Sequence, residues 1–261
     1  MMYGEFASVY DALMVDVDYQ RWARYILELA RQNEVTVARA VDCACGTGNF
    51  TVALAKSDIQ ITGVDLSAEM LQIAGEKSRS NGLRIPFILQ DMRKLSLHRP
   101  VDAVFCVLDG VNYLTRPCDV KAFFRSAYQA LRPGGGLFFD ISSYHKLADC
   151  LGDRCLGNDG ERISYIWQNH FDAGTRVLQM DLTFFVKESN GMYRRFSETH
   201  FQRAHHADET AMWLTEESFQ NIHIYGDQTF EPPTRDEERI HFVAVKRNGE
   251  DGGTLGAMST T

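Results

Sequence analysis

Residues 38–49 read ARAVDCACGTGN, an apolar strand that runs directly into a glycine turn. A helical stretch follows the turn, so backbone N–H groups and a helix N-terminus gather where the strand ends. Ligands of α/β proteins bind at the carboxyl edge of the sheet. Gly46 and Gly48 are therefore predicted to line a binding site, because a side chain in the turn would collide with the ligand.

An acidic residue follows the glycine turn at the spacing expected of a ribose-binding carboxylate. The second apolar run ends at Asp65, nineteen residues after Gly46, where a carboxylate can accept both hydroxyls of a ribose. A dinucleotide fingerprint would require a third glycine at position 51, which is Thr51, and a P-loop would require Gly-Lys-Ser/Thr. The pattern predicts a nucleoside site and gives little support to a pyrophosphate-binding turn.

Short apolar runs alternate with helical stretches on both sides of this turn, which is typical of a parallel sheet with helices on both faces. The expected strands are 38–45, 59–64, 85–89, 101–108 and 137–141. One helix is expected from Ser67, as N-cap, to Asn81-Gly82, and another from Asp119, as N-cap, to Leu131. Two amphipathic helices are expected in the first forty residues.

The periodicity changes after residue 145. Residues 163–171, 177–186 and 193–203 alternate apolar and polar side chains, as antiparallel strands with one wet face do. The chain then returns through a helix near 208–219 and strands at 221–226 and 240–245. The predicted fold class is α/β: a Rossmann-like, seven-stranded, mostly parallel sheet with helices on both faces, plus an inserted small antiparallel β lobe.

These patterns divide the chain into four predicted parts. They are an N-terminal helical lid (1–37), an α/β domain (38–145 and 207–247), the inserted β lobe (146–206) and a disordered tail (248–261). Because the insert leaves the sheet at its carboxyl edge, it is expected to form one wall of the acceptor pocket.

Composition limits the class of protein further. The 261 residues contain 27 Lys+Arg against 35 Asp+Glu, a formal net charge of −8, and no basic run, so a nucleic-acid partner is not expected. A membrane span is not expected either, and Glu5 and Asp11 replace the basic start of a signal peptide, so we expect a cytoplasmic protein. The Cys43-x-Cys45 spacing does not suit zinc, and no metal site is predicted.

Five segments in the right order resemble the class I S-adenosylmethionine-dependent methyltransferases. Residues 41–48 (VDCACGTG) resemble their first motif, with Ala44 in place of the usual first glycine. The other segments are GVDLS at 63–67 with Met70, QDM at 90–92, FCVLDGVNY at 105–113 and LRPGG at 131–135. The opening residues 3–11 resemble the N-terminal lid of small-molecule methyltransferases that carry a β insertion after strand five.

The resemblance implies S-adenosyl-L-methionine as the cofactor. It gives the ribose to Asp65, the adenine amino group to Asp91, and the ammonium group or a bridging water to Asp42. Tyr3 and Tyr10 would cover the methionine tail. The full set of implied cofactor-binding residues is Tyr3, Tyr10, Asp42, Cys45, Gly46, Gly48, Asp65, Leu66, Met70, Asp91, Met92, Val107 and Asp109.

The expected activity is methyl transfer to an oxygen or nitrogen of a small molecule by in-line displacement. LDGV at 108–111 is unlike the Asn/Asp-Pro-Pro-Tyr/Phe motif of one class of nucleic-acid amino-methylating enzymes. RNA or protein acceptors, a non-catalytic S-adenosylmethionine-binding protein and a nicotinamide-dependent oxidoreductase are the alternatives. Asp109, His200 and His206 are candidate bases, no catalytic residue is assigned, and both a monomer and a homodimer stay open.

Overall fold

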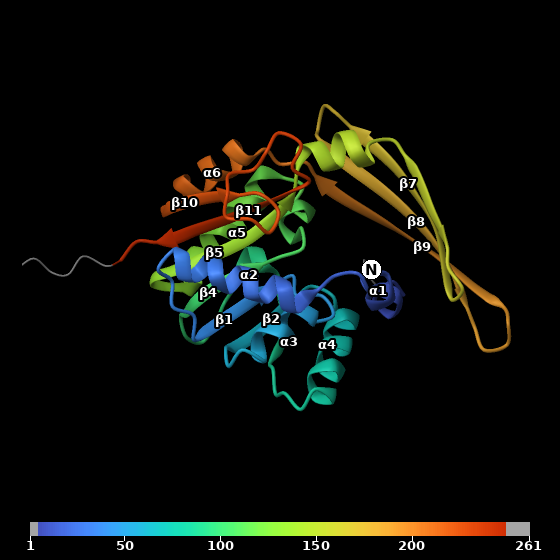
Figure 1. The fold of residues 1–261 in the computed structure, drawn as a ribbon, viewed down its shortest axis with the longest axis horizontal. Coiled ribbons are helices and arrows are strands. Elements are labelled where there is room, and N and C mark those ends of the chain that lie inside the picture. The colour runs from blue at the N-terminus through green and yellow to red at the C-terminus, as the bar shows by residue number, and fades with distance from the viewer. Residues whose placement is uncertain (1–4, 249–261) are drawn as a thin grey trace, which may run out of the picture.

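Seven strands form the larger sheet of the computed structural model, which describes residues 5–248 (Figure 1). They are β1 (Arg39–Cys43), β2 (Gln60–Asp65), β3 (Phe87–Leu89), β4 (Val101–Cys106), β5 (Leu131–Ser142), β10 (Phe219–Tyr225) and β11 (Arg239–Lys246). Their order is β10-β11-β5-β4-β1-β2-β3. Strands β1 to β5 are parallel to one another, β11 is antiparallel to β5, and β10 is antiparallel to β11. The predicted seven-stranded, mostly parallel sheet is confirmed.

Helices cover both faces of this sheet, as the sequence predicts (Figure 1). They are α2 (Tyr19–Gln32), α3 (Asn49–Ala55), α4 (Ala68–Ser80), α5 (Pro117–Ala130) and α6 (Ala207–Glu216). Helix α1 (Ala7–Leu13) packs instead against the inserted segment. Strand side chains alternate between two cores: Phe105 packs with α2 and α3, whereas Val104 and Cys106 pack with α5 and α6. The run 101–106 is apolar almost throughout because both of its faces are buried.

The observed helix starts agree with one of the two predicted N-caps and differ from the other. Ser67 caps α4 as predicted, since its hydroxyl accepts a hydrogen bond from the Met70 N–H at 3.1 Å. The N-cap predicted at Asp119 is wrong, because the N-cap is Arg116, three residues earlier, and α5 begins at Pro117. Proline suits the first helical position, where an N–H would lack a partner. Asp119 lies in the first turn and pairs with Arg93 and Arg116.

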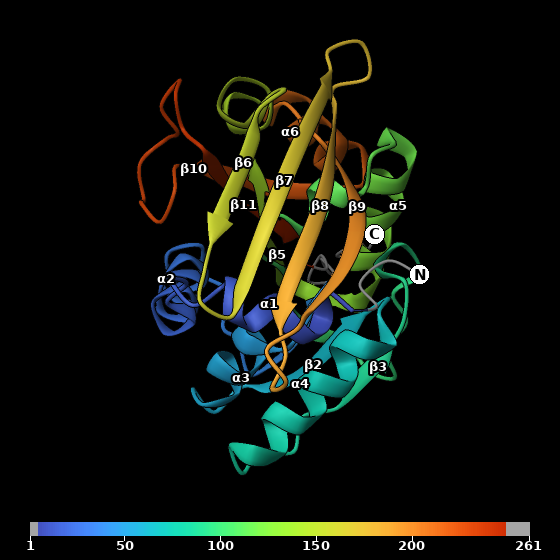
Figure 2. The ribbon, with the colours of Figure 1, turned by 90° about the vertical axis from the view of Figure 1, so that its right-hand side faces the viewer.

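The inserted segment forms a separate antiparallel sheet in the order β6-β7-β8-β9, seen face-on in Figure 2. Its strands are β6 (Cys155–Asp159), β7 (Ile163–Asp172), β8 (Val177–Lys187) and β9 (Tyr193–Arg203). The sequence predicts the last three. It does not predict the exposed edge strand β6, nor the π-helical segment η3 (His145–Leu151) that leads to it. Leu178, Leu182 and Phe184 form the buried inner face against α1.

Asn112 joins the two sheets. It lies in the 3-10 turn η2 (Gly110–Tyr113), and its side chain is fully buried. Its amide donates hydrogen bonds to the carbonyl oxygens of Ser142, on β5, and Arg203, on β9, both at 2.9 Å. Its own side-chain oxygen accepts from the Ser142 N–H at 2.9 Å. One side chain therefore fixes β9 against the main sheet.

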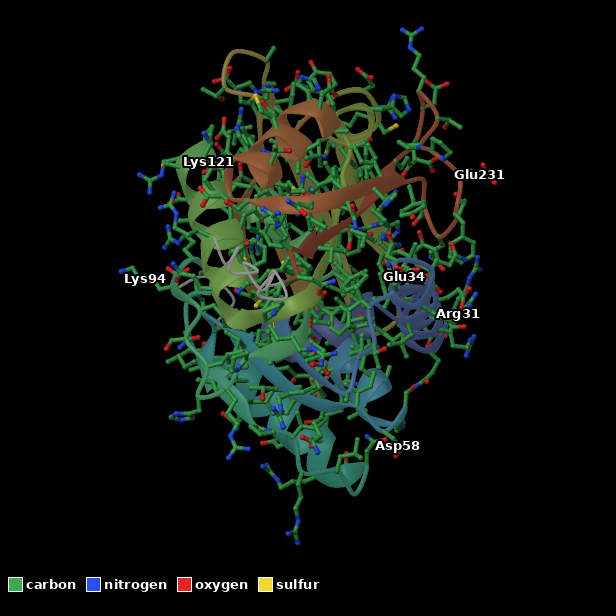
Figure 3. All side chains as sticks on the ribbon, turned by 90° about the vertical axis from the view of Figure 1, so that its left-hand side faces the viewer. Arg31, Glu34, Asp58, Lys94, Lys121 and Glu231 are labelled. Atoms are coloured by element: carbon green, nitrogen blue, oxygen red, sulfur yellow. The ribbon has the colours of Figure 1, made fainter. Side chains whose placement is uncertain are left out.

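Charged side chains lie at the periphery of the molecule. Arg31, Glu34, Asp58, Lys94 and Lys121 carry both signs and are spread over the face shown in Figure 3. Within residues 5–248, no helix is both long and apolar enough to cross a membrane.

Replacing Asn112 by Ala should lower the free energy of unfolding by about 2–4 kcal/mol, because buried peptide groups on two sheets lose their partners. Urea unfolding followed by circular dichroism measures the loss. Asn158→Ala, on the exposed strand β6, is the matched control and should change the value by less than about 0.5 kcal/mol. Equal effects of the two substitutions would contradict the role given to Asn112.

Candidate functional site

The glycine turn after β1 bends through three left-handed residues. The φ angles of Ala44, Gly46 and Gly48 are +54°, +53° and +76°. A Cβ on Gly48 would lie 2.9 Å from the Cβ of Ala74, so only glycine fits where α3 begins. A Cβ on Gly46 would meet no atom within 4 Å. The backbone of Gly46 therefore faces open space at the carboxyl edge of the sheet, where a ligand can approach it.

Asp65, at the end of β2, holds this turn in place. One carboxylate oxygen accepts the N–H of Gly46 at 2.8 Å, and the other accepts the N–H of Ser67 at 2.9 Å. Burial raises the pKa of Asp65, and these hydrogen bonds limit the rise. Leu66 is 65% exposed beside it, whereas Met70 is buried in the first turn of α4.

Asp42 lies beneath the turn, at the end of β1, and only 1% of it is exposed. Its carboxylate accepts a hydrogen bond from the Thr51 hydroxyl at 2.6 Å. Burial raises the pKa of Asp42 to about 7, and the Thr51 hydrogen bond only partly offsets this effect. Cys45, also predicted to contact the cofactor, lies in the turn itself, and its N–H donates to Val64 at 3.1 Å.

The third predicted segment is engaged with a neighbouring arginine. Asp91 caps the 3-10 turn η1 (Met92–Lys94), and both of its carboxylate oxygens accept from Arg93 at 2.6–3.0 Å. The side-chain hydrogen bonds from Arg93 hold the pKa of Asp91 below its usual value. Met92 points into the core, where its sulfur lies 3.9 Å from the Cys106 sulfur. Adenine recognition by Asp91 and Met92 stays a prediction.

The fourth segment follows β4 next to the glycine turn, since β4 pairs with β1. Val107 is buried, while Leu108 and Asp109 are left-handed, with φ of +60° and +57°. Such angles cost residues with a Cβ roughly 1–2 kcal/mol each. The Asp140 carboxylate, at the end of β5, accepts the N–H of Leu108 at 2.6 Å and that of Asp109 at 2.9 Å.

Both carboxylate oxygens of Asp109 have partners. One is 3.0 Å from Nη2 of Arg239, on β11, and the other accepts from the Gln202 amide, on β9, at 2.7 Å. Burial alone would raise the pKa of Asp109, but the positive charges of Arg239 and Lys146 and the hydrogen bonds from Gln202 and Arg239 together lower it. An ionised carboxylate with this set of partners is a poor general base. The geometry therefore disfavours Asp109 for that role.

The N-terminal helix α1 lies on the glycine turn. Asp11 accepts hydrogen bonds from the Thr47 hydroxyl at 2.6 Å and the Asn49 amide at 2.9 Å, and it pairs with Lys77 at 2.7 Å. Tyr10 is largely buried, and this burial raises its pKa well above the usual value. Tyr3, the other tyrosine predicted in this lid, lies outside the described residues, as does the tail beyond residue 248.

Of the two histidines predicted as candidate bases, His200 and His206, only His200 faces the sheet edge from the insert. His200, on β9, is buried, and its Nε2 lies 3.5 Å from a carboxylate oxygen of Glu198. The rings of Phe6 and Tyr113 flank it at 5.3 and 6.0 Å. His206 instead caps α6 and stacks on Tyr144. His205 is buried beside Trp213, and burial lowers its pKa to about 4.

Asp11 belongs to the predicted lid segment 3–11, without a predicted role. Three further polar residues of this edge were not predicted to belong to the site: Asp140, Gln202 and Arg239. Asp140 alone carries a local signal, an acid at the end of an apolar strand, like Asp42 and Asp65. The others reach the site from elements far away in the sequence.

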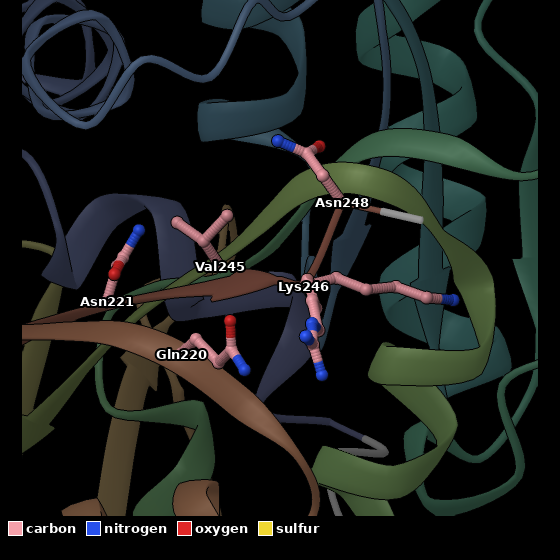
Figure 4. Close-up of a pocket in the computed structure, with 6 residues that line it drawn as sticks. Gln220, Asn221, Val245, Lys246 and Asn248 are labelled. Carbon is pink, nitrogen blue, oxygen red and sulfur yellow. The ribbon is translucent and has the colours of Figure 1, made fainter. Parts of the chain in front are cut away.

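A separate cavity of about 310 Å³ lies beside β10 and the end of β11, on the side of the main sheet opposite the carboxyl ends of the parallel strands. It is lined by Gln220, Asn221, Val245, Lys246, Arg247 and Asn248, drawn in Figure 4. Val245 pairs with Gly136, near the amino end of β5. The cavity is therefore remote from the glycine turn.

Comparison with known proteins agrees with this geometry. A family model described as a methyltransferase domain matches residues 40–135. An S-adenosylmethionine-dependent methyltransferase from Clostridium acetobutylicum ATCC 824 has 34% identity and a TM-score of 0.85, over 95% of this chain and 99% of its own. YqeM of Bacillus subtilis (strain 168) is 37% identical over 94% of this chain and 98% of its own. It is described as a methyltransferase, and its description names no acceptor.

A more distant structure shares the fold. The sugar N-methyltransferase KedS8 from Streptoalloteichus sp ATCC 53650 is 21% identical, with a TM-score of 0.75 over 92% of this chain and 93% of its own. Fold, glycine turn and relatives agree: the chain belongs to the class I S-adenosylmethionine-dependent methyltransferases. S-adenosylmethionine is its cofactor.

The raised pKa of Asp42 gives stability a defined pH dependence. The carboxyl ionises near pH 3.8 in the unfolded chain and near 7 in the folded one, so the folded chain binds the extra proton between these values. The free energy of unfolding should therefore fall from about pH 4 to 7, by on the order of a few kcal/mol, and Asp42→Asn should remove this fall. Urea unfolding across the range tests it, with exposed Asp16→Asn as control. A pH profile that Asp42→Asn leaves unchanged would refute the assignment.

Proposed function

We propose that this methyltransferase transfers the methyl group of S-adenosylmethionine to an oxygen or nitrogen of a small molecule. The observation that carries the proposal is that the inner face of β8 and β9 meets α1 beside the glycine turn: Phe6, preceding α1, donates its N–H to Glu198 at 3.2 Å and packs on Phe184 at 5.4 Å. A transfer site between these elements is walled by side chains, which suits a small acceptor.

The cofactor placement in this proposal uses residues of four strand ends. The turn at Gly46 leaves room for a ligand against its backbone, which supports the methionine portion there. Asp65 takes the ribose hydroxyls, with Leu66 beside the adenine, and Asp42 takes the ammonium group directly or through water. These carboxylates fit a cofactor that carries both hydroxyls and positive charge. The remaining residues of the proposed contact set are Tyr10, Cys45, Gly48, Met70, Asp91, Met92, Val107 and Asp109.

The chemistry needs mainly orientation and a dry site. S-adenosylmethionine supplies a methyl group on a sulfonium, whose displacement releases a neutral thioether. The chain holds the acceptor in line with that bond and excludes water. An acceptor hydroxyl or ammonium must also lose a proton. Among the three candidate bases His200 is the one we favour, because it lies on the insert with Glu198 behind its Nε2.

A nitrogen acceptor has one further point in its favour. KedS8, which shares the fold, is a sugar N-methyltransferase. At 21% identity this likeness concerns the fold, so oxygen acceptors stay in the proposal.

Methyl-labelled S-adenosylmethionine incubated with the enzyme and a bacterial extract tests the acceptor class. Label should appear in the small-molecule fraction, together with an equimolar amount of S-adenosylhomocysteine. In a separate binding measurement, Asp65→Ala should weaken S-adenosylhomocysteine binding at least about tenfold, because hydrogen bonds to a charged group are lost. Glu76→Ala, on the exposed side of α4, is the control and should bind normally. Label in RNA or protein would contradict the small-molecule acceptor. Binding without turnover would favour the non-catalytic alternative.

The same proposal makes α1 a cover over the cofactor, held by Asp11 on the glycine turn. Hydrogen exchange of residues 7–13 should slow when S-adenosylhomocysteine binds, while β7 and β8 change little until an acceptor is present. Mass spectrometry of peptic peptides measures both. Equal exchange of residues 7–13 with and without the ligand would remove the lid from the proposal, together with Tyr10.

A further inference from the structure

The segment after β4 is held in an unfavourable conformation by groups from two other strands. Leu108 and Asp109 are consecutive left-handed residues that both carry a Cβ. Neither is glycine or asparagine, the residues that adopt such angles most readily. Both of their N–H groups point to one carboxylate, that of Asp140, at 2.6 and 2.9 Å.

Asp140 is completely buried, and a buried carboxylate needs compensation. Arg239, which lies opposite Ser142 on the adjacent strand β11, supplies it by pairing with Asp140 and also, through Nη2, with Asp109 at 3.0 Å. Its guanidinium lies over the Trp22 ring, 5.4 Å from the centroid. Gln202 completes the set by donating to the other oxygen of Asp109. Every side-chain oxygen of the two acids is thereby engaged.

We propose that Asp140 and Arg239 are positioning residues for the cofactor: they hold the backbone of Leu108 and Asp109 in the left-handed conformation that faces the methionine portion. On this view Asp109 serves to anchor Arg239 and Gln202, and it moves no proton. The proposal rests on the cofactor placement of the preceding section. It adds the residues that shape one wall of that site, and it links this wall to the insert through Gln202.

The chain contains a chemically matched carboxylate on the opposite edge of the sheet. Asp102, near the amino end of β4, accepts the N–H groups of Ala38 and Arg39 at 2.7 and 2.8 Å. It pairs with Arg132 at 2.7 Å. Asp102 and Asp140 thus each accept two consecutive N–H groups and pair with one guanidinium, at opposite edges of the sheet. Both N–H groups bind the same oxygen of Asp102 but different oxygens of Asp140. Asp102 therefore separates a positioning role from a merely structural one.

The test is calorimetric titration of the purified full chain with S-adenosylhomocysteine, alongside thermal melting. Asp140→Asn and Arg239→Gln should each weaken binding at least tenfold, because the two N–H groups bind different oxygens of Asp140 whereas Asn has a single side-chain oxygen, and Gln carries no charge. Asp102→Asn should lower Tm through loss of the Arg132 ion pair but change Kd less than twofold. Unchanged Kd in folded Asp140→Asn, or an equal loss in Asp102→Asn, would overturn the proposal.

A glycine at position 108 makes the test independent of folding losses. Glycine adopts the left-handed conformation without the steric cost that Leu108 bears, so a Leu108→Gly chain depends less on Asp140 to hold this conformation. Asp140→Asn should therefore weaken binding at least threefold less in the Leu108→Gly background than in the natural sequence. Equal losses in the two backgrounds would overturn the positioning role. Absence of binding by the natural chain would instead refute the cofactor placement itself, an outcome distinct from a variant that binds as well as the natural chain.

Discussion

Carboxylates that accept backbone N–H groups at the carboxyl edge of the sheet are the interaction on which this site depends. Where a strand ends in a left-handed turn, its N–H groups lose the sheet as partner and need another acceptor. Asp65 of β2 accepts from the turn after β1, and Asp140 of β5 accepts from the turn after β4. In each case the acid comes from the strand beside the one that ends. Strand order therefore decides which turns can be stabilised.

The same arrangement gives the edge its charge. Asp42, Asp65, Asp109 and Asp140 lie at the ends of neighbouring strands, and Arg239 pairs with the last two. Burial raises the pKa of Asp42, and the nearby negative charge of Asp65 adds to the rise. A site of this kind favours a positively charged ligand, because such a ligand compensates the buried carboxylates. The sulfonium and ammonium groups of S-adenosylmethionine have that charge.

The inserted sheet is attached to this edge by polar side chains and not by apolar packing alone. Asn112 ties β9 to β5, and Gln202 ties it to Asp109. Phe6 and Asp11 connect the start of the chain to the insert and to the glycine turn, respectively. Hydrogen bonds of fixed geometry orient one element on another more narrowly than non-directional burial does. The insert and α1 thus keep a defined position above the strand ends.

Sequence by itself determined the succession of main-sheet strands and helices along the chain, the position of the glycine turn and the place of Asp65 at the end of β2, because these follow from residues close together in the chain. Ser67 as N-cap was predicted on that basis, whereas the cap at Asp119 failed because Pro117 suits the first turn better. Tertiary structure alone decided that Arg239 meets Asp109, 130 residues earlier. Such a pairing depends on β11 lying next to β5 in the sheet. The lateral order of strands in a sheet is not encoded in the side-chain pattern of any one strand.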